Sequence, residues 1–211
     1  MTNGPKISAV LFDYGMVLSG PPDPTAKMDM ERILGVDEKT FQAAYWRHRD
    51  SYDRGALSGL TYWENVGRDC HKPLTAVELD ALIDADNALW TQPNQAMIDW
   101  AAKLQRAGVK TGLLSNIGDA MEAGIRERFP WLNEFAHATF SHRLGIAKPD
   151  PAIYRHAAEG LQVPVGEILF VDDKEENVIA ARAAGMIAIQ YSGHAAFVEE
   201  LKRLGLAALG G

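Results

Sequence analysis

Ile7-Ser-Ala-Val-Leu-Phe12-Asp13-Tyr14-Gly15 is the stretch of sequence that decides how the rest of the chain is interpreted. Its apolar run has the length of a strand and ends on an aspartate, with a glycine two positions later. A buried strand that ends in this way can hold a carboxylate in the open at the edge of a sheet. An isolated Asp-x-Gly sequence is more typical of an ordinary turn, so the interpretation of Asp13 depends on the motifs that follow.

Further short apolar runs recur along the chain, and each is followed by a turn or a loop. We expect strands over residues 7–12, 109–114, 137–140, 168–171 and 187–190. They alternate with segments of helical spacing, over residues 95–107, 151–160, 177–184 and 195–204. This alternation predicts an α/β fold with a three-layer, Rossmann-like core, in which helices cover both faces of a parallel sheet. Ligands of such sheets bind at the carboxyl ends of the strands.

Residues 20–90 break this rhythm because they contain no convincing strand. Asp37 is expected to begin a helix that runs through Tyr45 and Tyr52 and ends before Gly55. Capping boxes are expected where a threonine precedes a glutamate by three residues, at Thr61-Tyr-Trp-Glu64 and Thr75-Ala-Val-Glu78. The chain is therefore predicted to form a core from residues 1–19 and 91–211, with an inserted α-helical cap domain over residues 20–90.

Polar side chains follow the later strands. Ser115 and Asn116 come after the second predicted strand and could donate hydrogen bonds to phosphate, although both are also common helix N-cap residues. Lys148 lies in a proline-held loop, where its point charge would suit a phosphate or a carboxylate-rich site, although a lone loop lysine is usually solvated.

Two adjacent aspartates, Asp172 and Asp173, directly follow the fourth predicted strand. Their mutual repulsion would be relieved by a hard cation such as Mg²⁺, which prefers carboxylate oxygens and water as ligands. An acidic helix N-terminus is the alternative. That alternative explains Glu175 and Glu176 well, but it explains the pair at the strand end less well.

Composition favours an ordinary soluble globular protein. The chain has 211 residues, of which 47% are hydrophobic and 23% charged, and its formal net charge is −7. Such a charge disfavours nonspecific binding to nucleic acid or anionic membranes, and no apolar run reaches membrane-spanning length. Because Cys70 is the one cysteine, no internal disulfide can form. We therefore expect a cytoplasmic protein with neither nucleic-acid nor membrane partners.

Taken in order, these motifs resemble those of the haloacid dehalogenase-like superfamily over essentially the whole chain. Its four motifs match Phe12-Asp13-Tyr14-Gly15, Leu114-Ser115-Asn116, Lys148-Pro149 and Val171-Asp172-Asp173 with Asn177. The helical insert resembles the alpha-helical cap of the first type. The Asp-x-Gly pattern is similar to that of members near the glucose-1-phosphate phosphatases.

The resemblance implies a magnesium-dependent phosphatase that acts on a small phosphorylated metabolite, for example a sugar phosphate, through an aspartyl-phosphate intermediate. Asp13 would be the nucleophile, and Mg²⁺ would be held by Asp13, the Gly15 carbonyl and Asp172 or Asp173. The residues implied to contact the phosphate are Ser115, Asn116 and Lys148, and Lys148 would also be catalytic. Asn177 would lie behind them and orient Lys148 or metal-bound water.

Gly15 departs from the family pattern, since most of its phosphatases carry a general-acid aspartate at this position. Loss of such an acid predicts a preference for good leaving groups, as in anomeric sugar, acyl or aryl phosphates. Arg47, His48 or Arg49 could replace the acid, although a solvated helix face is the commoner explanation. Tyr14, Tyr45, Trp46, Tyr62 and Trp63 could line the substrate pocket or form core.

Two alternatives belong to other classes of protein. A catalytically quiet relative could bind a phosphorylated ligand or a partner protein, and the absence of an acid at Gly15 gives this alternative some weight. A metal-independent haloacid dehalogenase is disfavoured by the pair Asp172 and Asp173, which would then lack a cation to offset its charge.

Overall fold

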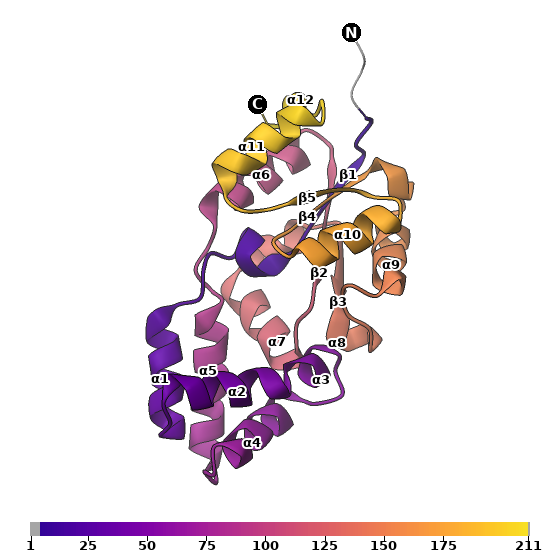
Figure 1. Ribbon diagram of the computed structural model, residues 1–211. Coiled ribbons are helices and arrows are strands. Elements are labelled where there is room, and N and C mark those ends of the chain that lie inside the picture. The colour runs from indigo at the N-terminus through magenta and orange to yellow at the C-terminus, as the bar shows by residue number, and fades with distance from the viewer. Residues whose placement is uncertain (1–4, 211) are drawn as a thin grey trace.

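The computed structural model describes residues 5–210 and contains a five-stranded sheet with the order β3-β2-β1-β4-β5 (Figure 1). Every neighbouring pair of strands is parallel. The strands are β1 (Ala9–Phe12), β2 (Lys110–Ser115), β3 (His137–Phe140), β4 (Ile168–Asp172) and β5 (Ile187–Gln190). All five predicted strands are confirmed, and the predicted α/β class with a parallel sheet is correct.

Side chains that alternate along each strand build two apolar clusters, one on each face of the sheet. Val10 and Phe12 pack against one group of helices, α6 (Gln95–Arg106), α7 (Asp119–Arg128) and α11 (His194–Arg203). Ala9 and Leu11 pack against the other group, α9 (Pro151–Leu161) and α10 (Glu175–Ala183). Because both faces of β1 are covered, the strand reads as an unbroken apolar run. The sequence pattern did not predict α7.

Five α-helices occupy residues 24–89, between η1 (Tyr14–Leu18) and α6. They are α1 (Pro24–Leu34), α2 (Glu38–Arg47), α3 (Arg49–Asp53), α4 (Gly59–Asp69) and α5 (Ala76–Leu89). They share an apolar cluster of their own, in which Tyr45, Tyr62 and Trp63 are fully buried. The chain leaves the sheet and returns to it side by side, because Ser19 and Pro93 form an isolated antiparallel bridge.

Local capping explains where several of these helices begin. Asp37 caps α2 as predicted, and Thr75 and Glu78 form the predicted capping box of α5. The capping box predicted at Thr61 and Glu64 is wrong, because Ser58 caps α4 and places Thr61 within its first turn.

The helix predicted to continue from Asp37 through Tyr52 is interrupted. α2 ends at Arg47, and His48 lies between it and the short helix α3. Gly55 follows α3 with a left-handed φ of 72°, as expected for a glycine beyond a helix end.

Shorter elements complete the chain. They are η1 (Tyr14–Leu18), η2 (Pro130–Glu134), α8 (Ser141–Leu144), η3 (Val165–Glu167) and α12 (Ala207–Gly210). Among residues 5–210, no helix is both long and apolar enough to cross a membrane. Helices α1–α5 lie beyond the carboxyl ends of the strands (Figure 1), so residues that follow β1, β2 and β4 face the helical insert.

Candidate active site

Asp13 lies where β1 gives way to η1. Its backbone N–H donates to the Val171 carbonyl oxygen at 2.9 Å, which continues the pairing of β1 with β4 by one residue. Its carboxylate accepts a hydrogen bond of 2.7 Å from the Tyr14 backbone N–H. The end of the strand therefore fixes the direction of this side chain, and its carboxylate lines the pocket described below.

Lys148 connects Asp13 with the end of β4. Its Nζ atom lies 2.9 Å from Asp13 Oδ1 and 2.6 Å from Asp172 Oδ2, and its side chain is only 1% exposed. Asn116 holds the main chain of Lys148 from both sides: its Nδ2 donates to the Lys148 carbonyl oxygen, and its Oδ1 accepts from the Lys148 N–H. The lysine is thus placed by β2 as well as by its own loop.

Asp172 is fully buried at the end of β4. Besides Lys148, it accepts hydrogen bonds from the Lys174 backbone N–H at 2.8 Å and from Asn177 Nδ2 at 3.0 Å. Asn177 therefore holds Asp172 directly, whereas the sequence predicted that it would orient Lys148 or metal-bound water. The next residue, Asp173, is only half-buried and lines the pocket.

The carboxylates of Asp13, Asp172 and Asp173 each offer an oxygen within 4.8 Å of the others. Burial raises the pKa of Asp13 to about 7, and the two other carboxylates add to this rise while Lys148 opposes it. Burial and Asp172 also raise the pKa of Asp173. Three carboxylates around one ammonium group form an oxygen-rich, negative donor set, which fits a hard divalent cation such as Mg²⁺.

The ion pair between Asp172 and Lys148 sets the direction in which the pKa of each residue is shifted. Burial alone would raise the pKa of Asp172, but Lys148 and the hydrogen bonds to this carboxylate hold it below its usual value. Burial alone would lower the pKa of Lys148, but Asp13 and Asp172 hold it above its usual value. Lys148 therefore remains a cation at the end of the sheet.

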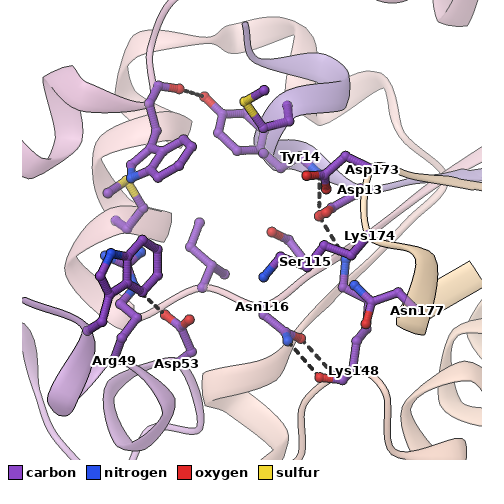
Figure 2. Close-up of a pocket in the computed structure, with 16 residues that line it drawn as sticks. Asp13, Tyr14, Arg49, Asp53, Ser115, Asn116, Lys148, Asp173, Lys174 and Asn177 are labelled. Carbon is purple, nitrogen blue, oxygen red and sulfur yellow. Dashed lines mark hydrogen bonds and ion pairs between the residues drawn. The ribbon is translucent and has the colours of Figure 1, made fainter. Parts of the chain in front are cut away.

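A pocket of about 160 Å³ opens between the strand ends and the helical insert (Figure 2). Most of the predicted site residues line it, namely Asp13, Gly15, Ser115, Asn116, Lys148, Asp173 and Asn177. Asp172 lies directly behind this wall. The Asn116 amide is occupied by the main chain of Lys148, whereas no hydrogen bond is found between the Ser115 hydroxyl and the rest of residues 5–210. The roles predicted for these residues remain predictions.

The helical insert supplies the opposite wall. Trp46, Arg49 and Asp53 reach the pocket from α2 and α3. Of the aromatic residues considered from sequence, Tyr14 and Trp46 line the pocket, while Tyr45, Tyr62 and Trp63 belong to the core of the insert.

The three polar residues proposed as substitutes for the missing acid also differ in whether they reach the pocket. Arg47 and His48 pair with Asp69, at 3.2 and 2.9 Å, and only Arg49 lines the pocket. Asp53 was not singled out from the sequence. The sequence offered one clue: Asp53 follows Arg49 by four residues, the spacing at which two side chains on a helix can form an ion pair.

Arg49 is a buried guanidinium group with several partners. Its Nε donates to Asp53 Oδ1 at 3.0 Å, and its Nη1 contacts the Tyr45 hydroxyl and lies 3.4 Å from Asp86 Oδ2. The rings of Tyr45 and Tyr52 lie 5.2 and 5.5 Å from its central carbon. Burial raises the pKa of both Asp53 and Asp86, and Arg49 opposes the rise.

The sheet order, the charged strand ends and the helical insert together define the class of hydrolase that the sequence motifs resembled. The family model of haloacid dehalogenase-like hydrolases matches residues 17–185. The chain belongs to this family, which confirms the resemblance and the expectation of a hydrolase.

Known proteins agree with this assignment. The chain is 32% identical over 199 residues to a sesquiterpene phosphatase of Aspergillus oryzae, covering 93% of this chain and 95% of the relative. It is 28% identical to a phosphatase of Mycobacterium tuberculosis, covering 86% and 85% of the two chains. A solved structure of a family enzyme from Bacteroides thetaiotaomicron superposes with a TM-score of 0.77, covering 90% and 96%, at 21% identity. That last similarity concerns the fold alone.

Proposed function

We propose that this protein is a magnesium-dependent phosphatase that hydrolyses a small phosphate monoester through an aspartyl-phosphate on Asp13. The observation that carries the proposal is the Asp13 carboxylate, which lines a pocket at the end of β1 and lies 2.9 Å from the buried Lys148 ammonium. The two phosphatases among its relatives, each similar over more than four fifths of both chains, support the same reaction.

In the proposed first step, a carboxylate oxygen of Asp13 attacks phosphorus while the bond from phosphorus to the leaving oxygen breaks. Water then attacks phosphorus, which releases inorganic phosphate and restores Asp13. Lys148 and the Ser115 hydroxyl would offset the negative charge on the phosphoryl oxygens. Asn116 and Asn177 would act by positioning, because their amides hold Lys148 and Asp172 in place.

Asp13, Asp173 and the Gly15 carbonyl are the proposed ligands of Mg²⁺, with Asp172 directly behind them. The convergence of three carboxylate oxygens within 4.8 Å supports a metal site here. Asp173 is preferred as a ligand because it lines the pocket, whereas Asp172 already binds Lys148 and Asn177. When bound, Mg²⁺ supplies positive charge that stabilises the phosphoryl group during its transfer.

We further propose that residues 20–90 are a cap domain over a core formed by residues 1–19 and 91–211; residues 1–4 and 211 lie outside the described part. The separate apolar cluster of α1–α5 supports the division, as does the pairing of Ser19 with Pro93 at its base. The cap would choose the substrate, since it contributes the wall opposite Asp13. Sugar, acyl and aryl phosphates are candidate substrates, because their good leaving groups depend less on the general acid that is missing at Gly15. The similarity to a sesquiterpene phosphatase adds an apolar monoester as a candidate.

Release of para-nitrophenol from para-nitrophenyl phosphate tests the proposal, with Mg²⁺ and with EDTA. We expect turnover that requires Mg²⁺ and disappears in Asp13→Asn. Asp80→Asn is the matched control, because Asp80 is an exposed aspartate on α5. Turnover that survives in EDTA and in Asp13→Asn would overturn the mechanism. No turnover by a folded wild-type protein would overturn the phosphatase proposal for this ester and favour a binding role.

A further inference from the structure

Apolar side chains form a large part of the pocket lining, beside the charged residues at the strand ends and the pair Arg49 and Asp53. Six of the residues that line the pocket are aromatic, methionine or isoleucine: Tyr14, Met16, Trp46, Trp90, Ile117 and Met121. They come from both sides, since Trp46 belongs to α2, while Ile117 and Met121 lie after β2 and on α7. The leaving group of a phosphate bound beside Asp13 would meet these apolar side chains.

The polar atoms of these aromatic side chains are already occupied. The Tyr14 hydroxyl donates to the Trp90 carbonyl oxygen at 3.0 Å (Figure 2). Trp46 Nε1 donates to Gln42 Oε1 at 2.8 Å. The rings therefore offer carbon surfaces to the pocket, and they offer no free N–H or O–H donor to a leaving group rich in hydroxyls.

Met16 has an unusual backbone conformation. Its φ of 59° lies in the left-handed region, which a residue with a side chain adopts at an energetic cost. The residue lines the pocket and is 37% exposed, so part of a large apolar residue faces solvent there. Backbone outliers of this kind concentrate at functional sites, where the surrounding structure maintains them.

Arg49 is a cation on the cap side of the pocket, and its charge is already compensated. The guanidinium group lies between Asp53 and Asp86, so two carboxylates oppose one positive charge. A second anionic group on the substrate would meet no net positive charge there. Lys174 also lines the pocket, as an exposed residue next to Asp173.

We infer that the substrate is a phosphate monoester whose leaving group is uncharged and mainly hydrocarbon, held against the six apolar residues. This inference rests on the proposed function and narrows it, because it excludes leaving groups with a carboxylate or a second phosphate. It also ranks aryl and other apolar esters above sugar phosphates.

A series of aryl phosphates separates contact with the pocket from chemical reactivity. Phenyl, 4-ethylphenyl and 4-butylphenyl phosphate have leaving groups of similar acidity but increasing apolar length. 4-(Carboxymethyl)phenyl phosphate matches the ethyl compound in size and adds a negative charge. We expect kcat/KM to rise about fourfold for each methylene that becomes buried. The carboxymethyl compound should fall below the ethyl compound.

Calorimetric titration of the same four compounds onto Asp13→Asn, with Mg²⁺, measures the ranking even where turnover is slow. The affinity should follow the same order. Equal values for all four, or a preference for the carboxymethyl compound, would overturn the inference. If para-nitrophenyl phosphate is still hydrolysed in a manner that depends on Mg²⁺ and Asp13, only the substrate class fails and the proposed function remains.

Trp46→Ala tests the apolar wall without disturbing the core, because Trp46 is 52% exposed. We expect about a tenfold loss in kcat/KM for the butyl compound, and little change for phenyl phosphate. Leu60→Ala is the matched control: Leu60 is 51% exposed and lies on α4, outside the residues that line the pocket. An equal response from the two variants would contradict a role for Trp46 in holding the leaving group.

Discussion

Two buried cations face the same pocket from opposite sides, and each lies between two carboxylates. On the core side, Lys148 lies between Asp13 and Asp172. On the side of the helical insert, which is the proposed cap, Arg49 lies between Asp53 and Asp86. The two clusters use the same kinds of charge, yet their surroundings lead to different chemistry.

The difference lies in what surrounds each cation. The Lys148 cluster has a third carboxylate, Asp173, and the excess negative charge suits a divalent cation. The Arg49 cluster instead has two tyrosine rings, and the Tyr45 hydroxyl donates to Asp86 at 2.7 Å. A buried ion pair alone therefore does not identify an active site. The additional acidic group at the strand ends is what supports the proposed active site.

The largest expected effect comes from breaking the core cluster with Lys148→Met. Two buried carboxylates would lose their shared cation, so turnover of para-nitrophenyl phosphate should fall about a thousandfold. The free energy of unfolding should fall by about 3 kcal/mol, as measured by urea denaturation. Lys39→Met is the control, since Lys39 is an exposed lysine on α2. If Lys148→Met were stable and fully active, Lys148 would be needed neither for turnover nor for the stability of the core cluster.

Gly15→Asp should add to the core side the acid that the sequence lacks. A Cβ atom at Gly15 meets no heavy atom within 4 Å in the described structure, and its φ of −62° suits any residue. Turnover of an alkyl phosphate such as ethyl phosphate should rise up to about a hundredfold, because general acid catalysis helps poor leaving groups most. Gly15→Ala has the same Cβ without the acid. A similar gain in both variants would rule out proton donation as the cause.

Glu122 on α7 extends the comparison to a buried carboxylate outside the pocket. Burial alone would raise its pKa, but hydrogen bonds from Arg126, His142 and Arg143 hold it below its usual value of 4.5. The ionised form is thus stabilised in the folded protein, and this stability is present above pH 4.5 and lost as pH falls through the folded-state pKa.

The free energy of unfolding of Glu122→Gln should therefore be about 2 kcal/mol lower than that of wild type at pH 7. The difference between the two proteins should shrink as the pH is lowered below 4.5. Urea denaturation at a series of pH values measures it. A difference that stays constant with pH would mean that the charge of Glu122 is not what stabilises the fold.

The smallest expected effect concerns the cap cluster. Asp53→Asn removes one of the two carboxylates that compensate Arg49, so the pocket should tolerate an anionic leaving group better. The ratio of kcat/KM for 4-(carboxymethyl)phenyl phosphate to that for 4-ethylphenyl phosphate should rise about tenfold. An unchanged ratio would mean that Arg49 does not control the charge of the substrate.

The core side could be predicted from the sequence because parallel strands bring their carboxyl ends to one edge. Asp13, Ser115 and Asp172 each follow an apolar run, so the order of the runs was enough to bring them together. The place of Lys148 in the site could be predicted from the sequence, but its contacts with Asp13 and Asp172 became visible only in the structure.

The cap side could not be predicted in the same way. Neighbouring residues on α2 have opposite fates, since Tyr45 is 2% exposed and Trp46 is 52% exposed and lines the pocket. Asp86 reaches Arg49 from another helix, 37 positions along the chain. Helical periodicity indicates which residues share a face, but the packing of helices decides what that face meets.

Mass spectrometry of acid-quenched protein during turnover of para-nitrophenyl phosphate tests the central claim most directly. If Asp13 is the nucleophile, the peptide that contains it should gain the mass of one phosphoryl group in wild type, and the adduct should be absent from Asp13→Asn. Turnover without any adduct on that peptide, or an adduct on another residue, would contradict the account.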